Sequence, residues 1–192
     1  METPLVALFQ LIDAFKAIGI EYVVVGSLAS SFHGDYRASA DIDLVAEVKD
    51  EHVQSFVNKL QGDFYVDDLA INKAIARGRS FNVIHLAGIL KVDIFIPSSD
   101  LSKQQLQRRQ LQLIDADGPK EIWIATAEDT ILAKLHWYRQ GGEVSELQWR
   151  DVKGILGTQG SRLDFEYLRS WAKRVDVVDL LDRASKEIGS SA

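Results

Sequence analysis

The chain has 192 residues, of which 46% are hydrophobic and 26% charged, a composition typical of one globular domain, or of a domain with an appendage. It contains no cysteine, which excludes disulfides and thiolate metal sites, and its formal net charge of −6 argues against a chain-wide footprint for nucleic acid, so no DNA partner is expected. No apolar run approaches the roughly 20 residues of a membrane helix and no signal peptide is recognisable, so we expect a cytoplasmic protein with no membrane partner.

The first part of the chain alternates between helical and extended patterns. Apolar residues at helical spacing predict a helix over 4–18, and the β-branched run YVVV at 22–25 predicts a buried strand. Gly26-Ser27 predicts a turn, with Ser27 placed to cap a short helix over 28–33. The patterns that follow predict a strand over IDLVAEV, helices over 50–60 and 68–77, a strand pair FNVIHLA and KVDIFIP around Gly88, a helix over 99–109, and apolar alternation at 111–115 and 121–124.

Beyond Thr126 the pattern becomes helical. Thr126 and the acidic residues after it are typical of a helix N-terminus, and they open the segment TAEDTILAKLHWYRQ. Three further segments have helical spacing: SELQWRDVKGIL, DFEYLRSWAKRV and VDLLDRASKEI. We therefore expect an α/β-class (mixed α+β) domain over 1–125 and a C-terminal helical part over 126–192 packed on it.

Two aspartates stand one residue apart at the head of the second expected strand. Because alternate strand side chains share a face, Asp41 and Asp43 would lie side by side with Ile42 buried behind them. Two ionised carboxylates that close repel each other, which raises one pKa unless a cation compensates. Hard oxygen ligands suit Mg²⁺, which takes further ligands from water and substrate phosphates. An aspartate at a strand end is also an ordinary turn former, so the pair alone is a weak signal.

A third carboxylate lies inside another apolar run. Asp93 interrupts the strand KVDIFI, where a charge is costly to bury unless it is paired or bound to a metal. If this strand lies beside the strand that holds Asp43, the three carboxylates can form a two-metal site. Such a site is a clamp for in-line displacement at phosphorus.

The Gly26-Ser27 turn has a second use besides capping a helix. Glycine permits a close approach of backbone to ligand, and the N–H groups of the next helical turn can hold a phosphate. Combined with Asp41 fifteen residues later, the turn is more specific than a lone Gly-Ser. It would hold a triphosphate while the aspartates hold the metal ions that bridge it.

Two other chemistries that use close aspartates fit the order of segments poorly. Glycosyltransferases with an Asp-x-Asp metal site place it after several βα units, whereas only 40 residues precede Asp41 here. Haloacid-dehalogenase-type phosphatases place the apolar run before the aspartates, whereas here the run follows them.

Taken together, the motifs resemble the polymerase-β-like nucleotidyltransferase superfamily. Its pattern is a Gly-Ser or Gly-Gly turn, an Asp-x-Asp or Asp-x-Glu soon afterwards, and a third acid on a later strand. The matching residues are Gly26, Ser27, Asp41, Asp43 and Asp93.

Within that superfamily, HGDYRASADIDL is similar to the AbiEii-type toxin branch, with Gly34, Arg37 and Ser39 at the places of a Gly, an Arg and a small or hydroxyl residue. The resemblance is good over 20–97 and partial over 126–156. Over the second range it implies a functional lysine and a later basic-acidic pair, which Lys134 and Arg150-Asp151 supply; a surface lysine and a surface ion pair are the alternatives. Relatives often have another acid where this chain has Gly154.

The resemblance implies a small mixed sheet flanked by helices and a metal-dependent nucleotidyltransferase, which moves an NMP from an NTP to an acceptor hydroxyl and releases pyrophosphate. Two Mg²⁺ ions, with Mn²⁺ as an alternative, would be held by Asp41, Asp43 and Asp93. The triphosphate would lie against Gly26, Ser27 and Lys134, and the nucleotide site would be completed by Arg37 and Asp151.

The sequence does not choose the acceptor, which could be a protein side chain, a tRNA end or a small molecule. A cognate antitoxin protein would be a partner if the chain is one half of a toxin–antitoxin pair. The alternative is a nucleotide-binding or regulatory protein on the same fold with weak or no catalysis, against which the three intact acids count.

Two groups of residues are given structural roles by their setting. Four tryptophans fall in apolar-periodic segments and are expected in the core: Trp123, Trp137, Trp149 and Trp171. The basic stretch QRRQ at 107–110 is expected to be a solvated face rather than an RNA contact.

Overall fold

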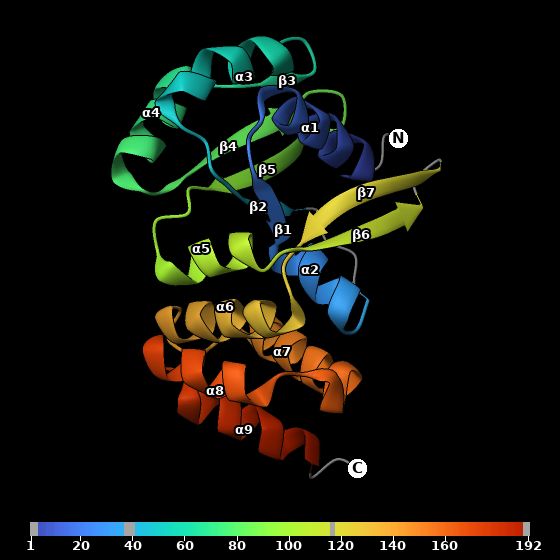
Figure 1. Ribbon diagram of the computed structural model, residues 1–192, viewed down its shortest axis with the longest axis vertical. Coiled ribbons are helices and arrows are strands. Elements are labelled where there is room, and N and C mark those ends of the chain that lie inside the picture. The colour runs from blue at the N-terminus through green and yellow to red at the C-terminus, as the bar shows by residue number, and fades with distance from the viewer. Residues whose placement is uncertain (1–3, 37–40, 116–117, 190–192) are drawn as a thin grey trace.

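The computed structural model describes residues 4–36, 41–115 and 118–189. A mixed β-sheet lies at its centre (Figure 1). Within these residues the sheet has seven strands in the order β3-β4-β5-β2-β1-β7-β6. The strands are β1 Tyr22–Val25, β2 Ile42–Ala46, β3 Phe64–Tyr65, β4 Ser80–His85, β5 Leu90–Phe95, β6 Gln110–Asp115 and β7 Pro119–Ile124.

The centre of the sheet brings together segments that are far apart in the sequence. β2 runs antiparallel to β1, so Val25 at the end of β1 lies opposite Asp43. β2 also runs parallel to β5, in a register that pairs Asp43 with Asp93. A parallel pair needs a long crossover, and here it contains the antiparallel β3–β4 pair and the helices α3 and α4. The predicted strand pair around Gly88 is confirmed as the antiparallel β4–β5 hairpin.

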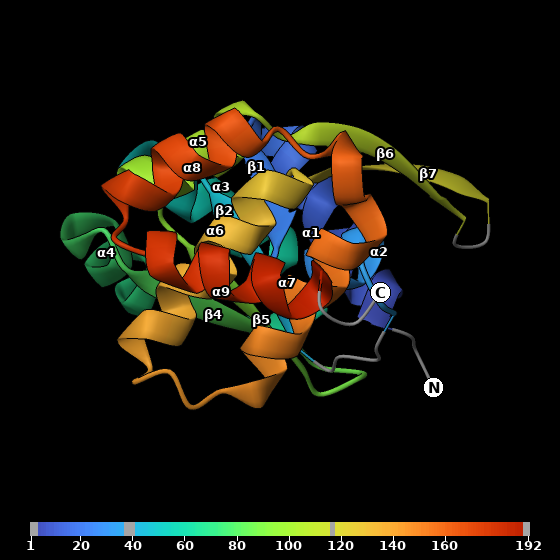
Figure 2. The ribbon, with the colours of Figure 1, turned by 90° about the horizontal axis from the view of Figure 1, so that it is seen from below.

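Helices cover both faces of the sheet (Figures 1 and 2). The side chains of one face, such as Val24, Leu44 and Ile94, pack with α1, α3 and α4 in the larger hydrophobic core. The other face contributes Val23, Val25 and Val45 to a smaller cluster with α5. The helices are α1 Pro4–Ile18, α2 Gly26–His33, α3 Val53–Leu60 after a short 3-10 turn Asp50–His52, α4 Asp68–Arg77 and α5 Asp100–Gln107.

The end of the chain forms a helical layer below the second face, and Figure 2 shows it in front of the sheet. It consists of α6 Ala127–Gln140, α7 Glu146–Gln159, α8 Phe165–Arg174 and α9 Val178–Gly189. As predicted, Thr126 caps α6, accepting a hydrogen bond from Asp129 N at 3.1 Å. These helices share their own hydrophobic cluster, to which α5 adds Leu101. The division of the chain at 125/126 stays a prediction.

The start of α2 differs from the sequence prediction. The helix begins at Gly26, its N-cap residue is Val25, and no side chain caps it, so the assignment of Ser27 as a cap is wrong. The reason is that β1 passes directly into α2 through Gly26, whose φ of +62° makes the turn without a loop. Among the described helices, none is long and apolar enough to cross a membrane.

Candidate active site

The turn between β1 and α2 lies against the carboxylate of Asp43. A Cβ atom built on Gly26 would lie 2.0 Å from Asp43 Oδ2, a distance that no real side chain could occupy. The positive φ of Gly26 also disfavours any L-residue. Position 26 therefore requires glycine for two independent reasons, and the backbone at the start of α2 directly borders the carboxylate.

The three predicted aspartates lie close enough for their charges to interact. The pKa of Asp43 is raised, first by burial of the side chain and then by the negative charges of Asp93 and Asp41, while Lys134 and Lys91 oppose the shift. Asp93 is half-buried and its Oδ2 lies 2.8 Å from Lys91 Nζ. Asp41 precedes β2 and is exposed, because the strand begins only at Ile42.

The donor chemistry of this neighbourhood fits a divalent cation. Asp43 and Asp93 present hard oxygen ligands on paired positions of neighbouring strands. A cation would offset both the burial and the repulsion by Asp93 that raise the pKa of Asp43. Across the described residues, however, no three acidic or histidine side chains converge closely enough to form a metal-binding group. The ligand role of the three aspartates is therefore a proposal.

Lys134 and Asp151 meet between α6 and α7. Lys134 Nζ donates a hydrogen bond to Asp151 Oδ2 at 2.8 Å, and the two residues are only 6% and 8% exposed. Neither is therefore a surface residue, and Asp151 pairs with Lys134 rather than with the adjacent Arg150. A lysine ammonium has three donors, so this contact leaves others that can reach a ligand.

Close backbone packing joins α2 to α7. A Cβ atom on Gly34 would lie 2.8 Å from Ile155 N, and one on Gly154 would lie 3.1 Å from Asp35 Oδ2. An acid at position 154 would face the Asp35 carboxylate here. Gln159 of α7 strengthens the contact, because its Nε2 donates to the His33 carbonyl at 2.6 Å. His33 Nε2 donates in turn to the carbonyl of Ala125, between β7 and α6, at 2.6 Å. Arg37 and Ser39 lie outside the described residues.

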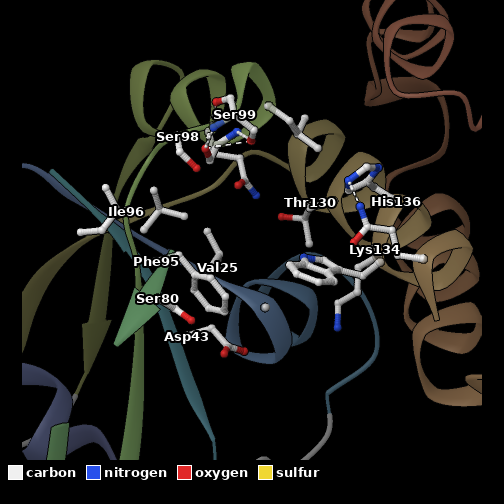
Figure 3. A pocket seen from close by; sticks show the side chains of 18 of the residues that line it. Val25, Asp43, Ser80, Phe95, Ile96, Ser98, Ser99, Thr130, Lys134 and His136 are labelled. Carbon is white, nitrogen blue, oxygen red and sulfur yellow. Dashed lines mark hydrogen bonds between the residues drawn. The ribbon is translucent and has the colours of Figure 1, made fainter. Parts of the chain in front are cut away.

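A cavity of about 650 Å³ opens between the second face of the sheet, α5 and α6. Figure 3 shows Asp43 and Phe95 on its strand side and Thr130 and Lys134 on the side of α6. Of the predicted site residues, the described lining contains Gly26, Ser27, Asp43 and Lys134; Asp41, Asp93 and Asp151 lie outside that lining. The volume falls within the range of pockets that bind small molecules and cofactors.

The cavity also contains residues that the sequence analysis missed. Trp137 lines it and is 53% exposed, so its assignment to the core is wrong. The available signal was its position three residues after Lys134, because residues i and i+3 share a helix face. Phe95 likewise shares a strand face with Asp93, two residues earlier.

Other residues assigned by their setting have mixed outcomes. Trp149 and Trp171 are buried as expected, at 8% and 9% exposure, whereas Trp123 is only half-buried. The predicted solvated face at 107–110 holds for Gln107 and Gln110, which are exposed, whereas Arg108 and Arg109 are half-buried and lie over aromatic rings. Arg108 Cζ lies 3.5 Å from the ring centre of Tyr167, and Arg109 Cζ lies 5.0 Å from that of Trp123.

Comparison with solved structures places the fold. The chain is similar to ANT(2'')-Ia in its crystal structure with adenylyl-2''-tobramycin, at 14% identity and a TM-score of 0.57, covering 90% of this chain and 99% of that one. It is also similar to the solution structure of the antibiotic-resistance factor ANT(2'')-Ia, at 15% identity and a TM-score of 0.52, covering 95% and 98%. An antigenic nucleotidyltransferase-like protein from Paracoccidioides brasiliensis matches at 15% identity and a TM-score of 0.49, covering 93% and 91%.

The two likenesses to ANT(2'')-Ia define the class: the chain has the nucleotidyltransferase fold, a mixed sheet flanked by helices and followed by a helical part. No protein-family description and no characterised protein matches the chain at the level of sequence. Its assignment to the AbiEii-type toxin branch stays a prediction.

Proposed function

We propose that the protein is a metal-dependent nucleotidyltransferase that moves an NMP from an NTP to an acceptor hydroxyl. The observation that carries the proposal is the placement of Gly26 against Asp43, which is paired in register with Asp93 and shares its cavity with Lys134. A backbone turn that could hold phosphate, one carboxylate and one lysine therefore border the same cavity, and the paired Asp93 lies beside that carboxylate, which supports the proposal.

The chain's own residues have separate tasks in this reaction. The backbone at Gly26 and the hydroxyl of Ser27 bind the β- and γ-phosphates, and Lys134 neutralises triphosphate charge while Asp151 orients its ammonium. The acceptor oxygen forms a bond to the α-phosphorus, the bond from that phosphorus to the bridging oxygen breaks, and pyrophosphate leaves. Asp93 takes the proton of the acceptor hydroxyl. Mg²⁺, or Mn²⁺ in its place, held by Asp41, Asp43 and Asp93, would supply charge stabilisation for the phosphates.

The proposal does not choose among three classes of acceptor. A tRNA end, a protein side chain and a small molecule all present a suitable hydroxyl. If the chain is an AbiEii-type toxin, the acceptor is a cellular macromolecule and a cognate antitoxin is its partner.

One observation favours a second candidate, a nucleotide-binding protein with weak or no catalysis. Lys91 already forms an ion pair with Asp93 at 2.8 Å, which competes with the proton-accepting role of that carboxylate. In this candidate the cavity binds NTP without transferring it, and the protein has a regulatory role that depends on whether NTP is bound.

The experiment is transfer of label from α-labelled NTPs with Mg²⁺ into tRNA, cell-extract proteins and small molecules, combined with calorimetric titration of the same NTPs. If the protein is an enzyme, one acceptor class becomes labelled. Asp93→Asn should then lower the rate by several orders of magnitude. The matched control Asp63→Asn, at an exposed acid away from the site, should not. Nucleotide binding without labelling of any class supports the second candidate. Full activity in Asp93→Asn removes Asp93 from the site.

A further inference from the structure

Beyond Asp43, the lining of the cavity becomes apolar and aromatic. Val45 follows Asp43 on the same strand face, and its register partner on β5 is Phe95. Trp137 of α6 lies against Phe95, with ring centres 6.4 Å apart and planes inclined by 55°. We call Val45, Phe95 and Trp137 the aromatic shelf; all three line the cavity. A tryptophan left 53% exposed inside a cavity offers an indole face that a flat ring can cover.

A polar amide lies in the same cavity. Gln105 of α5 lines it, and although the residue is only 5% exposed, its amide is not one of the fully buried polar groups that lack a partner among the described residues. A ligand in the cavity can therefore reach this amide. An amide offers both donors and an acceptor, which are the groups that the edge of a nucleobase requires.

The charges of the lining restrict the occupant further. Among the described lining residues Asp43 is the one carboxylate, whereas Arg79 and Lys134 are basic. A polycationic ligand would need several carboxylates, so a lining with one carboxylate does not favour such a ligand. A neutral ring joined to an anionic group matches the combination of an aromatic shelf, an amide and two cations.

We propose that the aromatic shelf binds the nucleobase of the NTP and that Gln105 hydrogen-bonds to the edge of that base. This inference rests on the proposed function, which places the triphosphate at Gly26 and Lys134. Two residues along a strand span about 7 Å, so the shelf lies one ribose length from the phosphate end of the site. That distance fits a base joined through its ribose to the triphosphate.

The test compares two ligands that differ only in having a nucleoside. Calorimetry with Mg²⁺ measures the affinity of each of the four NTPs and of inorganic tripolyphosphate for the wild type, Trp137→Ala, Trp137→Phe and Gln105→Leu. Trp137→Ala is expected to weaken NTP binding about tenfold or more, the size of one lost base–aromatic stack, and to leave tripolyphosphate binding unchanged. Trp137→Phe should retain most of the affinity, and Gln105→Leu should reduce the preference among the four NTPs.

Two controls separate this inference from the function on which it rests. Tyr65→Ala removes another exposed aromatic ring, 58% exposed and outside the cavity lining, and should change neither affinity. Lys134→Gln should weaken both ligands. The inference is overturned if Trp137→Ala leaves NTP affinity unchanged, or weakens tripolyphosphate as much as NTP. If the wild type binds neither ligand, the proposed function falls and the inference falls with it.

Discussion

At the scale of single residues, the environment of Asp43 has a consequence for stability. Its pKa is raised above the ordinary value of 3.8 by burial and by the charges of Asp93 and Asp41. The folded protein therefore holds this proton more tightly than the unfolded chain. As pH rises from about 4 through the raised pKa of the folded state, the unfolded chain ionises first, so the contribution of Asp43 to stability falls.

We predict that Asp43→Asn stabilises the metal-free protein at pH 7 and has no such effect well below pH 3.8, where both states are protonated. Urea denaturation in a chelator, measured across this pH range, gives the comparison. Asp63→Asn changes an exposed acid and should leave the pH profile as it is. A loss of stability at pH 7 in Asp43→Asn would show that the carboxylate is structural.

Single residues also show what sequence could and could not predict about the candidate site. Asp43 and Asp93 could be expected together because each interrupts an apolar strand, although their pairing depends on β2 and β5 being neighbours. The Lys134–Asp151 contact was not predicted, since it depends on how α6 crosses α7. Trp137 was assigned wrongly because an apolar residue at helical spacing faces either a core or a cavity, and periodicity does not distinguish the two.

At the scale of elements, the Lys134–Asp151 pair ties α6 to α7 inside the protein. Removing one member of a buried ion pair leaves a charge in a poorly solvated place, which costs far more than the pair itself contributes. Because α6 also lines the cavity, this contact links the packing of two helices to the geometry of the site.

We predict that Lys134→Met lowers the free energy of unfolding by about 3–5 kcal/mol, and that adding Asp151→Asn recovers part of that loss. A double-mutant cycle measured by urea denaturation gives the coupling. The exposed Arg169–Asp182 pair, also at 2.8 Å, is the matched control and should show a coupling below about 1 kcal/mol. Equal couplings for the two pairs would mean that the Lys134 contact is effectively solvated.

Elements with strong local patterns were predicted well from sequence. The predicted helix over 68–77 is α4, which spans Asp68–Arg77 and ends at Gly78 in the left-handed conformation. The start of α2 was missed because Gly26 turns the chain with a positive φ, which has no signature beyond the glycine itself. The sheet order was not predictable, because strand neighbours are chosen by long-range packing of apolar faces and not by local sequence.

At the scale of the whole molecule, the helical layer and the sheet domain share contacts. α2 packs against both α6 and α7, and Leu101 of α5 belongs to the hydrophobic cluster of the helical layer. A cluster of buried Asp129 with half-buried Tyr167 and Arg108 joins α6, α8 and the end of α5, and the Tyr167 hydroxyl donates to Asp129 Oδ1 at 2.5 Å.

We therefore predict that the protein unfolds in one cooperative transition and that residues 1–125 do not fold alone. Far-ultraviolet circular dichroism reports on every helix and strand, whereas three of the four tryptophans, Trp137, Trp149 and Trp171, report on the helical layer. Coincident denaturation curves from the two probes support one unit. Separate midpoints would show that the chain divides at 125/126 into parts of independent stability.

The parallel pairing of β2 with β5 also bears on when the proposed site comes into being during synthesis. A ribosome makes the chain from the N-terminus, so the Gly26 turn and Asp43 emerge long before Asp93, Lys134 and Asp151. Until α6 and α7 have left the exit tunnel, the nascent chain has the turn and the first carboxylates but lacks the α6 wall of the cavity and the Lys134–Asp151 pair. On the proposed function, a chain that ends before α7 would therefore lack nucleotide transfer, which would begin only once α7 is in place.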